Sequence, residues 1–215
     1  MSDQRVEEIK GLPRRRSVWT PLPREFYSRD SAQVARDLLG RVLIHEGPEG
    51  LTSGIIVEAE AYYGEDDPAS HAYRGRTERN RVMYGEPGHA YVFLLYGVNH
   101  LLNVVTMPRG IPGAVLLRAL QPLEGLELMR RRRGVSDPLL LASGPGRLSR
   151  AMGVDLSHNG IDMTRPPLYI SRERILMGFE VAVTPRIGVR DRRPLRFYVK
   201  GNPYVSKPKG GAPQV

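Results

Sequence analysis

The chain has 215 residues, of which 40% are hydrophobic and 26% charged, a balance typical of one folded globular domain and too apolar for a disordered chain. It contains no cysteine, which excludes disulfides, iron–sulfur clusters, cysteine-ligated zinc and thiol nucleophiles. No segment reaches the roughly 20 apolar residues that span a bilayer, and residues 1–16 lack the apolar centre of a secretory signal. We therefore expect a soluble, cytoplasmic protein that does not act on membranes.

Positive charge is the first indication of a partner, because the net charge is +9. Lysine is rare, so arginine carries most of this charge, and the planar guanidinium suits phosphate. One explanation is a compositional bias of the genome or adaptation to heat. The arginines are clustered, however, within residues 14–16, 74–81, 130–133 and 186–196, which a bias does not require. Since no strongly amphipathic basic helix accompanies them, the clusters favour nucleic acid over a membrane surface.

The chain divides into three parts without an internal repeat. Residues 1–19 form a polar tail, which is either disordered or adds affinity for nucleic acid. One folded domain is expected over residues 20–206. Residues 207–215, KPKGGAPQV, are expected to be a flexible C-terminal tail.

The first predicted element is a helix within residues 28–40, which ends at Gly40. Its candidate N-caps are Ser28, Asp30 and Ser31. Residues 41–46 and 51–62 are extended runs separated by Gly-Pro-Glu-Gly, a pattern that predicts a hairpin.

Three consecutive antiparallel strands are predicted next, because β-branched and aromatic residues fill three runs of strand length. The runs are residues 89–97, 100–107 and 113–120. A short helix over 121–134 is expected to start at Pro122, and a second, over 143–153, to be capped by Ser143. Further strands are expected at 167–171, 180–189 and 195–201. The fold class is therefore α+β, with a mixed, mostly antiparallel sheet and flanking helices.

Candidate chemistry is concentrated at the end of the 51–62 strand. Side chains alternate along a strand, so Glu58, Glu60 and Tyr62 share one face while the other face is apolar. Two carboxylates on one face repel each other and need an arginine, a metal ion or a raised pKa. The simpler alternative is that both are exposed residues paired with arginine, and Glu58 is expected to support Glu60 or pair in this way.

An aromatic side chain is expected at a hairpin tip. Core packing accounts for Tyr91 and Phe93, but Tyr96 adjoins Gly97, where the chain turns. An aromatic ring there is exposed unless it inserts into a partner. Aromatic residues among arginines suit base stacking, or a wedge pushed into a nucleic-acid duplex.

The chain resembles the alkyladenine (3-methyladenine) DNA glycosylase family, bacterial type, over nearly all of residues 20–206. The matching segments are IIVEAEAYYG, SHAYRGRTERNRVMYGEPGHAYVFLLYGVNHLLNV, GAVLLRALQPLEGL, SGPGRLSRAM and PLRFYVKGNPYVS. The resemblance implies a single domain with a protruding β-hairpin that enters DNA. It also implies a monomer, associated with the nucleoid, that hydrolyses the N-glycosidic bond of damaged purines in double-stranded DNA. No metal or cofactor is expected.

The resemblance also implies roles for individual residues. Glu60 matches the general base that activates the attacking water, and Arg118 matches an arginine near that water and the flipped nucleotide's phosphate. The expected contacts to the DNA backbone are Arg76, Arg79 and Arg81.

The base pocket is implied in the same way. Tyr62, His71 and Phe93 match the residues that sandwich the flipped base, and Asn103 matches an asparagine that screens purine substituents. Tyr96 matches the residue that intercalates into the vacated stack. For His71 two other interpretations stay open, a hydrogen-bonded structural role and acid catalysis.

Two other functions remain open from the residues alone. One is a metal-dependent nuclease that uses carboxylates as magnesium ligands. Its ligands would be Glu58, Glu60, Asp66 and Asp67. The other is a non-catalytic nucleic-acid-binding module in which only the arginines act. Otherwise Glu65, Asp66 and Asp67 are expected to form a solvated turn.

A glycosylase that also cleaves the strand needs an amine nucleophile, and no lysine lies between Lys10 and Lys200. The sequence therefore predicts a monofunctional enzyme.

Overall fold

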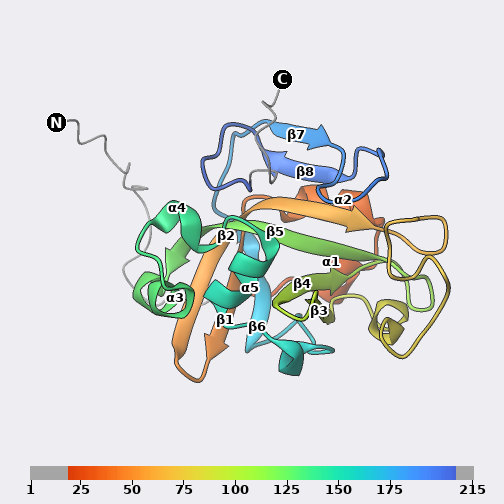
Figure 1. Cartoon of the computed structure of the whole chain (residues 1–215), viewed down its shortest axis with the longest axis horizontal. Coiled ribbons are helices and arrows are strands. Elements are labelled where there is room, and N and C mark those ends of the chain that lie inside the picture. Colours follow the sequence, from red (N-terminus) through yellow and green to blue (C-terminus); the bar gives the residue numbers. More distant parts are fainter. Residues whose placement is uncertain (1–18, 207–215) are drawn as a thin grey trace.

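The computed structural model describes residues 19–206 (Figure 1). The predicted tail over 207–215, and that over 1–19 except for Trp19, lie outside the described residues. Within the described chain, no helix is both long enough and apolar enough to cross a membrane.

One eight-stranded sheet organises the structure, with β3-β4-β5-β2-β1-β6 as its main order. The strands are β1 (Arg41–Gly47), β2 (Gly50–Tyr62), β3 (Ala90–Leu95), β4 (Asn99–Val105), β5 (Ala114–Glu124), β6 (Leu168–Arg174), β7 (Val181–Thr184) and β8 (Arg196–Val199). The predicted α+β class is confirmed. The sheet is antiparallel in every pairing rather than mixed, since neighbours that are not consecutive in the chain, such as β5 and β2, also run in opposite directions.

Strand β2 is the central element, 13 residues long and paired along its length with β5. The other edge of β2 pairs with two different strands. Its first half pairs with β1 in the predicted hairpin, in which the last residue pair before the turn is Gly47↔Gly50. The second half pairs with β8 at Glu58–Glu60. The register against β5 shifts on both sides of Glu58, so β2 is irregular where it changes partners.

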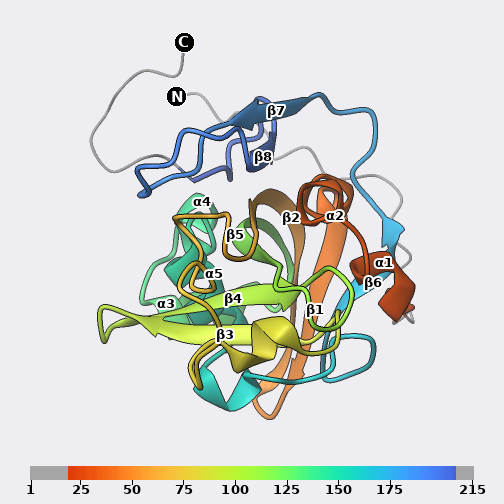
Figure 2. The same ribbon diagram turned by 90° about the vertical axis from the view of Figure 1, so that its right-hand side faces the viewer.

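Short helices cover the sheet (Figures 1 and 2). They are α1 (Arg24–Tyr27), α2 (Ser31–Leu38), α3 (Leu126–Arg133), α4 (Pro138–Leu141) and α5 (Pro145–Met152), with single 3₁₀ turns η1 (Arg81–Tyr84) and η2 (Leu156–His158). The predicted N-cap Asp30 is confirmed, since its side chain accepts from the N–H groups of Ala32 and Gln33. Helix α2 packs on β2, and α5 packs on β4 and β5.

Two predicted helix starts are wrong. The helix expected from Pro122 begins at Leu126, because β5 continues to Glu124 and pairs there with the start of β2. Strand pairing satisfies the backbone of these residues and overrides their local preference. Helix α5 is preceded by Gly144 without a side-chain cap, so the expected cap at Ser143 is also wrong.

The strand expected over residues 180–189 is shorter, since β7 ends at Thr184. Pro185 follows and cannot donate to a ladder. Residues 185–195 instead form a loop that lies against the end of β2, where Leu195 accepts a backbone hydrogen bond from Ala61. This loop reaches the face of β2 that carries the two glutamates.

The apolar face of β2 lies in the main core, as the alternation predicts, and it contributes Ile55, Val57, Ala59 and Ala61. A second, smaller apolar cluster contains Ala72, Met83, Tyr91, Val105 and Ala114. Phe93 packs against this second cluster. The sheet therefore has its core on one face of β2 and a polar face directly behind it.

Candidate active site

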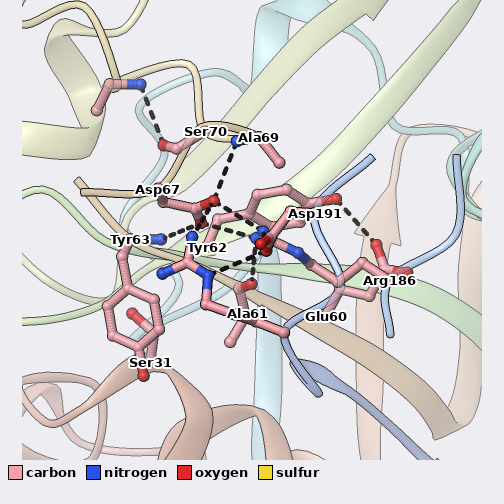
Figure 3. Close-up of polar contacts among 12 residues, drawn as sticks. Ser31, Glu60, Ala61, Tyr62, Tyr63, Asp67, Ala69, Ser70, Arg186 and Asp191 are labelled. Carbon is pink, nitrogen blue, oxygen red and sulfur yellow. Dashed lines mark hydrogen bonds and ion pairs between the residues drawn. The ribbon is translucent and has the colours of Figure 1, made fainter. Parts of the chain in front are cut away.

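The Glu60 carboxylate is fully buried and is held by three donors. Its Oε2 accepts from the Tyr62 hydroxyl at 3.0 Å and from Arg118 Nη1 at 3.1 Å, and its Oε1 accepts from the Ile187 N–H at 2.8 Å. Figure 3 shows the hydrogen bond between Tyr62 and Glu60. A carboxylate has about four acceptor positions. The three donors occupy both acceptor positions of Oε2 and one of Oε1, so the remaining acceptor position is on Oε1.

The second carboxylate, Glu58, is fully buried and also held by arginine. It accepts from Arg118 Nε at 3.0 Å, from Arg196 Nε at 2.7 Å, and from the N–H and hydroxyl of Ser206 at 2.7 and 2.9 Å. The sequence left open whether an arginine, a metal ion or a raised pKa accommodates the two glutamates. In the structure, Arg118 pairs with both of them. The pair is not exposed, so the alternative of surface residues is wrong.

Arg118 joins the two carboxylates from β5, through Nε to Glu58 and Nη1 to Glu60. Burial alone would lower the pKa of Arg118, but the two adjacent carboxylates raise it above its ordinary value. Arg118 therefore remains charged in this buried position, and Glu58, Glu60 and Arg118 form a fixed triad.

Tyr62 is held from two sides at the end of β2. Its hydroxyl donates to Glu60, and the Arg186 guanidinium carbon lies 4.4 Å from the centre of its ring. Burial, together with the charge of Glu60, raises the pKa of Tyr62 above its ordinary value. The phenol is therefore a neutral donor, and its ring is fixed in orientation.

The sheet register aligns the base-pocket candidates with Glu60. Tyr91 pairs with Asn103, Asn103 pairs with Leu116, and Leu116 pairs with Glu60. Residues directly opposite in neighbouring strands point to the same face. The row therefore crosses β3, β4, β5 and β2 on one face. Leu116, which sequence reasoning missed, is the buried residue between Asn103 and Glu60.

His71 and Phe93 lie beside this row. Their ring centres are 4.4 Å apart, and His71 Nδ1 is 2.7 Å from the Tyr91 hydroxyl. Burial, with a smaller contribution from Arg79, lowers the pKa of His71, so the imidazole is neutral at pH 7. Asn103 donates from Nδ2 to the carbonyl of Tyr91 at 3.0 Å. The structure thus brings together three of the base-pocket candidates, His71, Phe93 and Asn103, around Tyr91. Their roles in binding a base remain predictions.

The predicted hairpin between β3 and β4 projects from the rest of the molecule in Figure 2. Tyr96 at its tip is 88% exposed and has φ of 51°, in the left-handed region that non-glycine residues seldom adopt. Gly97 has φ of 70°, and the Val98 N–H donates to the Leu95 carbonyl to close the turn. The turn holds an aromatic side chain in solvent, as the sequence predicts.

The arginines proposed for the DNA backbone lie in the exposed segment after His71. The Arg79 guanidinium carbon is 5.8 Å from the centre of the Phe93 ring, which places it next to the aromatic pocket. Arg76 lies 5.9 Å from the Tyr84 ring, and Arg81 forms an exposed ion pair with Glu78. Their charges are accessible to an anionic partner.

The expectation of a solvated acidic turn is wrong for one of its three residues. Glu65 and Asp66 are exposed, but Asp67 is fully buried and forms ion pairs with Arg186 and Arg193. Figure 3 shows Asp67 beside Arg186. The partners come from the loop that follows β7. Local sequence could not show this, because the two segments are more than a hundred residues apart.

The four acids of the nuclease alternative do not converge. Glu58 and Glu60 share Arg118, whereas Asp67 is bound by Arg186 and Arg193, and Asp66 is exposed. In residues 19–206, no group of three or more histidine, aspartate or glutamate side chains is arranged to hold a metal ion.

Comparisons with known proteins identify the family of the chain. A family model described as "Methylpurine-DNA glycosylase (MPG)" matches residues 25–203. A protein of Methanoculleus marisnigri named "Putative 3-methyladenine DNA glycosylase" is 49% identical over 191 residues, covering 86% of this chain and 98% of that protein. A protein of the same name from Carboxydothermus hydrogenoformans is 47% identical over 189 residues, and one from Bacillus cereus is 43% identical over 201 residues. Each alignment covers 86% of this chain and 98% of the relative.

The family model and these relatives show that the chain is a DNA glycosylase, a hydrolase of N-glycosyl bonds. The chain belongs to the methylpurine-DNA glycosylase family.

Proposed function

We propose that this enzyme removes alkylated or deaminated purines from double-stranded DNA as the first step of base excision repair. It flips the damaged nucleotide out of the duplex and hydrolyses its N-glycosidic bond, leaving an abasic site. The observation that carries the proposal is the Glu60 carboxylate, whose Oε1 keeps an open acceptor position on the same sheet face as Asn103 and Tyr91.

Flipping is required because the glycosidic carbon is inaccessible within a stacked duplex. The exposed ring of Tyr96 is a suitable wedge, since it can fill the space that the nucleotide leaves. The exposed arginines after His71 supply positive charge for the phosphates. The flipped base then enters between Tyr62, His71 and Phe93.

In the chemical step, water on Glu60 Oε1 attacks C1′ of the sugar and gives its proton to the carboxylate. The bond to the purine breaks, and its electron pair leaves with the base. The transition state resembles an oxocarbenium ion, and the negative charge of Glu60 stabilises it. Arg118 and Tyr62 keep the other oxygen of Glu60 occupied, so the carboxylate cannot rotate freely.

The charge of the purine determines how much help it needs as a leaving group. A cationic base such as 3-methyladenine leaves as a neutral molecule and needs no acid. A neutral base such as hypoxanthine leaves more readily when it is protonated. Stacking against aromatic rings also favours cationic and electron-poor purines.

We propose that Asn103 screens the purine edge, and its position in the row of paired residues that leads to Glu60 supports this. Its Nδ2 already donates to a backbone carbonyl, so its orientation is fixed. We propose that it rejects guanine through the exocyclic amine. Replacement with serine should then raise release of guanine-derived bases, measured against hypoxanthine; unchanged discrimination would remove Asn103 from this role.

The experiment that tests the function is incubation with duplexes carrying hypoxanthine, ethenoadenine or 3-methyladenine in the presence of EDTA. Alkaline cleavage of the lesion-containing strand detects the abasic site, and chromatography detects the released base. Release of base with chelator present supports the proposal. Strand cleavage that EDTA abolishes, or DNA binding without any base release, contradicts it.

The enzyme is proposed to be monofunctional. Lys200 is the one lysine of residues 19–206, and its Nζ is bound to Glu180 at 2.9 Å. Borohydride trapping of a covalent complex with DNA would show an imine intermediate and contradict this part of the proposal.

A further inference from the structure

An ion cluster lies beside the face of β2 that carries Glu60, formed by the buried Asp67 and Arg186 with the partly buried Asp191 and Arg193. We call it the Arg186 cluster. Figure 3 labels Asp67, Arg186 and Asp191. The Arg186 side chain is fully buried. Its Nη1 donates to Asp67 Oδ2 at 2.7 Å and to the Ala61 carbonyl at 2.9 Å, and its Nη2 donates to Asp67 Oδ1 at 2.7 Å and Asp191 Oδ2 at 2.6 Å.

The cluster joins three separate chain segments. Ala61 belongs to the end of β2, Asp67 to the turn that follows it, and Arg186 to the loop after β7. The Asp67 carboxylate also accepts from the N–H groups of Tyr63 and Ala69, so it organises its own turn. That turn leads directly into His71, and therefore one guanidinium links the strand of Glu60 to the segment that carries His71.

Arg186 is also connected to two of the groups that donate hydrogen bonds to the Glu60 carboxylate. The N–H of the next residue, Ile187, donates to Glu60 Oε1. The guanidinium lies 4.4 Å from the centre of the Tyr62 ring, and the Tyr62 hydroxyl donates to Glu60 Oε2. A displacement of Arg186 would therefore disturb the donors to both oxygens of Glu60 at once.

The cluster is balanced in charge, with two acids and two arginines. Burial alone would raise the pKa of Asp67, but hydrogen bonds from Arg186 and from the Tyr63 N–H lower it below its ordinary value. Asp67 is thus ionised at neutral pH. Because a buried ion pair often contributes little more stability than packed apolar residues, stability alone does not account for this arrangement.

We propose that Arg186, held by Asp67, is a positioning residue that fixes Glu60 and Tyr62 relative to the segment carrying His71. The inference rests on the proposed function of Glu60. Arg186 is enclosed and does not reach substrate, so it acts only through the groups that it holds.

The test compares Arg186→Lys with the wild type at saturating enzyme on a hypoxanthine duplex. Lysine keeps the positive charge but cannot bind both oxygens of Asp67 together with Asp191 and the Ala61 carbonyl. We expect the single-turnover rate of base release to fall about 10²-fold, since small misplacements of reacting groups have effects of this size. The Kd for a duplex carrying tetrahydrofuran, an uncleavable abasic analogue, should change less than about threefold, because phosphate contacts determine it.

Three further variants make the test specific. Asp67→Asn should lower the rate similarly, and Asp67→Asn with Arg186→Lys should be no slower than the slower single variant, because both remove the same contact. Asp191→Asn removes one of the acceptors of Arg186, so it should lower the rate measurably, by roughly tenfold, which is less than the effect of Arg186→Lys. If Arg186→Lys does not fold, the single-turnover rate of Asp191→Asn tests the positioning role instead. Arg192→Ala, an exposed arginine of the same loop, is the control and should keep the wild-type single-turnover rate.

Equal losses of rate, DNA affinity and melting temperature in the Arg186 and Asp67 variants would show a purely structural role and overturn the inference. A wild-type rate in Arg186→Lys and Asp191→Asn would also overturn it. These outcomes leave the proposed function intact as long as the wild type releases base. If the wild type releases no base from any lesion duplex, the proposed function itself fails.

Discussion

The buried triad and the exposed hairpin use charge in opposite ways. In the triad each charged group is paired, so Arg118 is held by both Glu58 and Glu60 in the interior. Around the hairpin, Arg76 and Arg79 are exposed and contact aromatic rings rather than carboxylates. The chain thus places arginine in two environments: buried and paired with carboxylates, as Arg118 is, and exposed, as Arg76 and Arg79 are. Changes in the first region should alter rates and stability, and changes in the second should alter affinity.

Glu60→Gln should have the largest effect on catalysis. The substitution keeps the shape of the side chain but removes the negative charge, which in the proposed mechanism accepts the proton of water and stabilises the transition state. We expect the single-turnover rate to fall by about 10³-fold or more. Binding to a lesion duplex, measured by fluorescence anisotropy, should survive. Glu65→Gln, an exposed residue of the next turn, is the control. Full turnover by Glu60→Gln would indicate a different base.

Arg118→Met should have the largest effect on stability. It leaves Glu58 without one of its arginine partners and Glu60 without the one arginine partner that it has within residues 19–206, and uncompensated buried charge costs about 3–5 kcal/mol. Urea denaturation at pH 7 measures this loss. The matched change Arg172→Met, at an exposed position, should stay within about 0.5 kcal/mol. A similar stability for both variants would mean that the triad is not held by charge.

Tyr96→Ala should lower activity without lowering stability, since the side chain is 88% exposed. Losing the wedge removes a few kcal/mol that offset unstacking, so kcat/KM on duplex DNA should fall roughly tenfold or more. Tyr96→Phe keeps the ring and should retain most activity. The effect should be much smaller on single-stranded DNA. An equal loss on both substrates would argue against a role in opening the duplex.

Arg76→Ala should have the smallest effect, a weakening of DNA binding that does not depend on sequence. Each phosphate contact contributes about 0.9 to the slope of log affinity against log salt. We therefore expect a shallower slope by about that amount and an unchanged single-turnover rate at saturating enzyme. Arg172→Ala, an exposed arginine on β6, should keep the wild-type slope. No change in slope for Arg76→Ala would place Arg76 outside the DNA contact.

The sequence by itself determined what depends on periodicity and turn chemistry. Alternation along residues 51–62 was enough to place Glu58, Glu60 and Tyr62 on one face, and the Gly-Pro punctuation was enough to predict the β1–β2 hairpin. Both are local properties, since side-chain direction in a strand and the geometry of a short turn depend on adjacent residues.

Only the tertiary structure decided which charged groups meet. It placed Arg118 between the two glutamates, and it brought Arg186 to Asp67 across more than a hundred residues. It also extended β5 beyond Pro122, against the helical pattern. The physical reason is the same in each case. Pairing between distant segments satisfies backbone groups and prevents buried charges from being left unpaired, and the partners lie outside any local stretch of sequence.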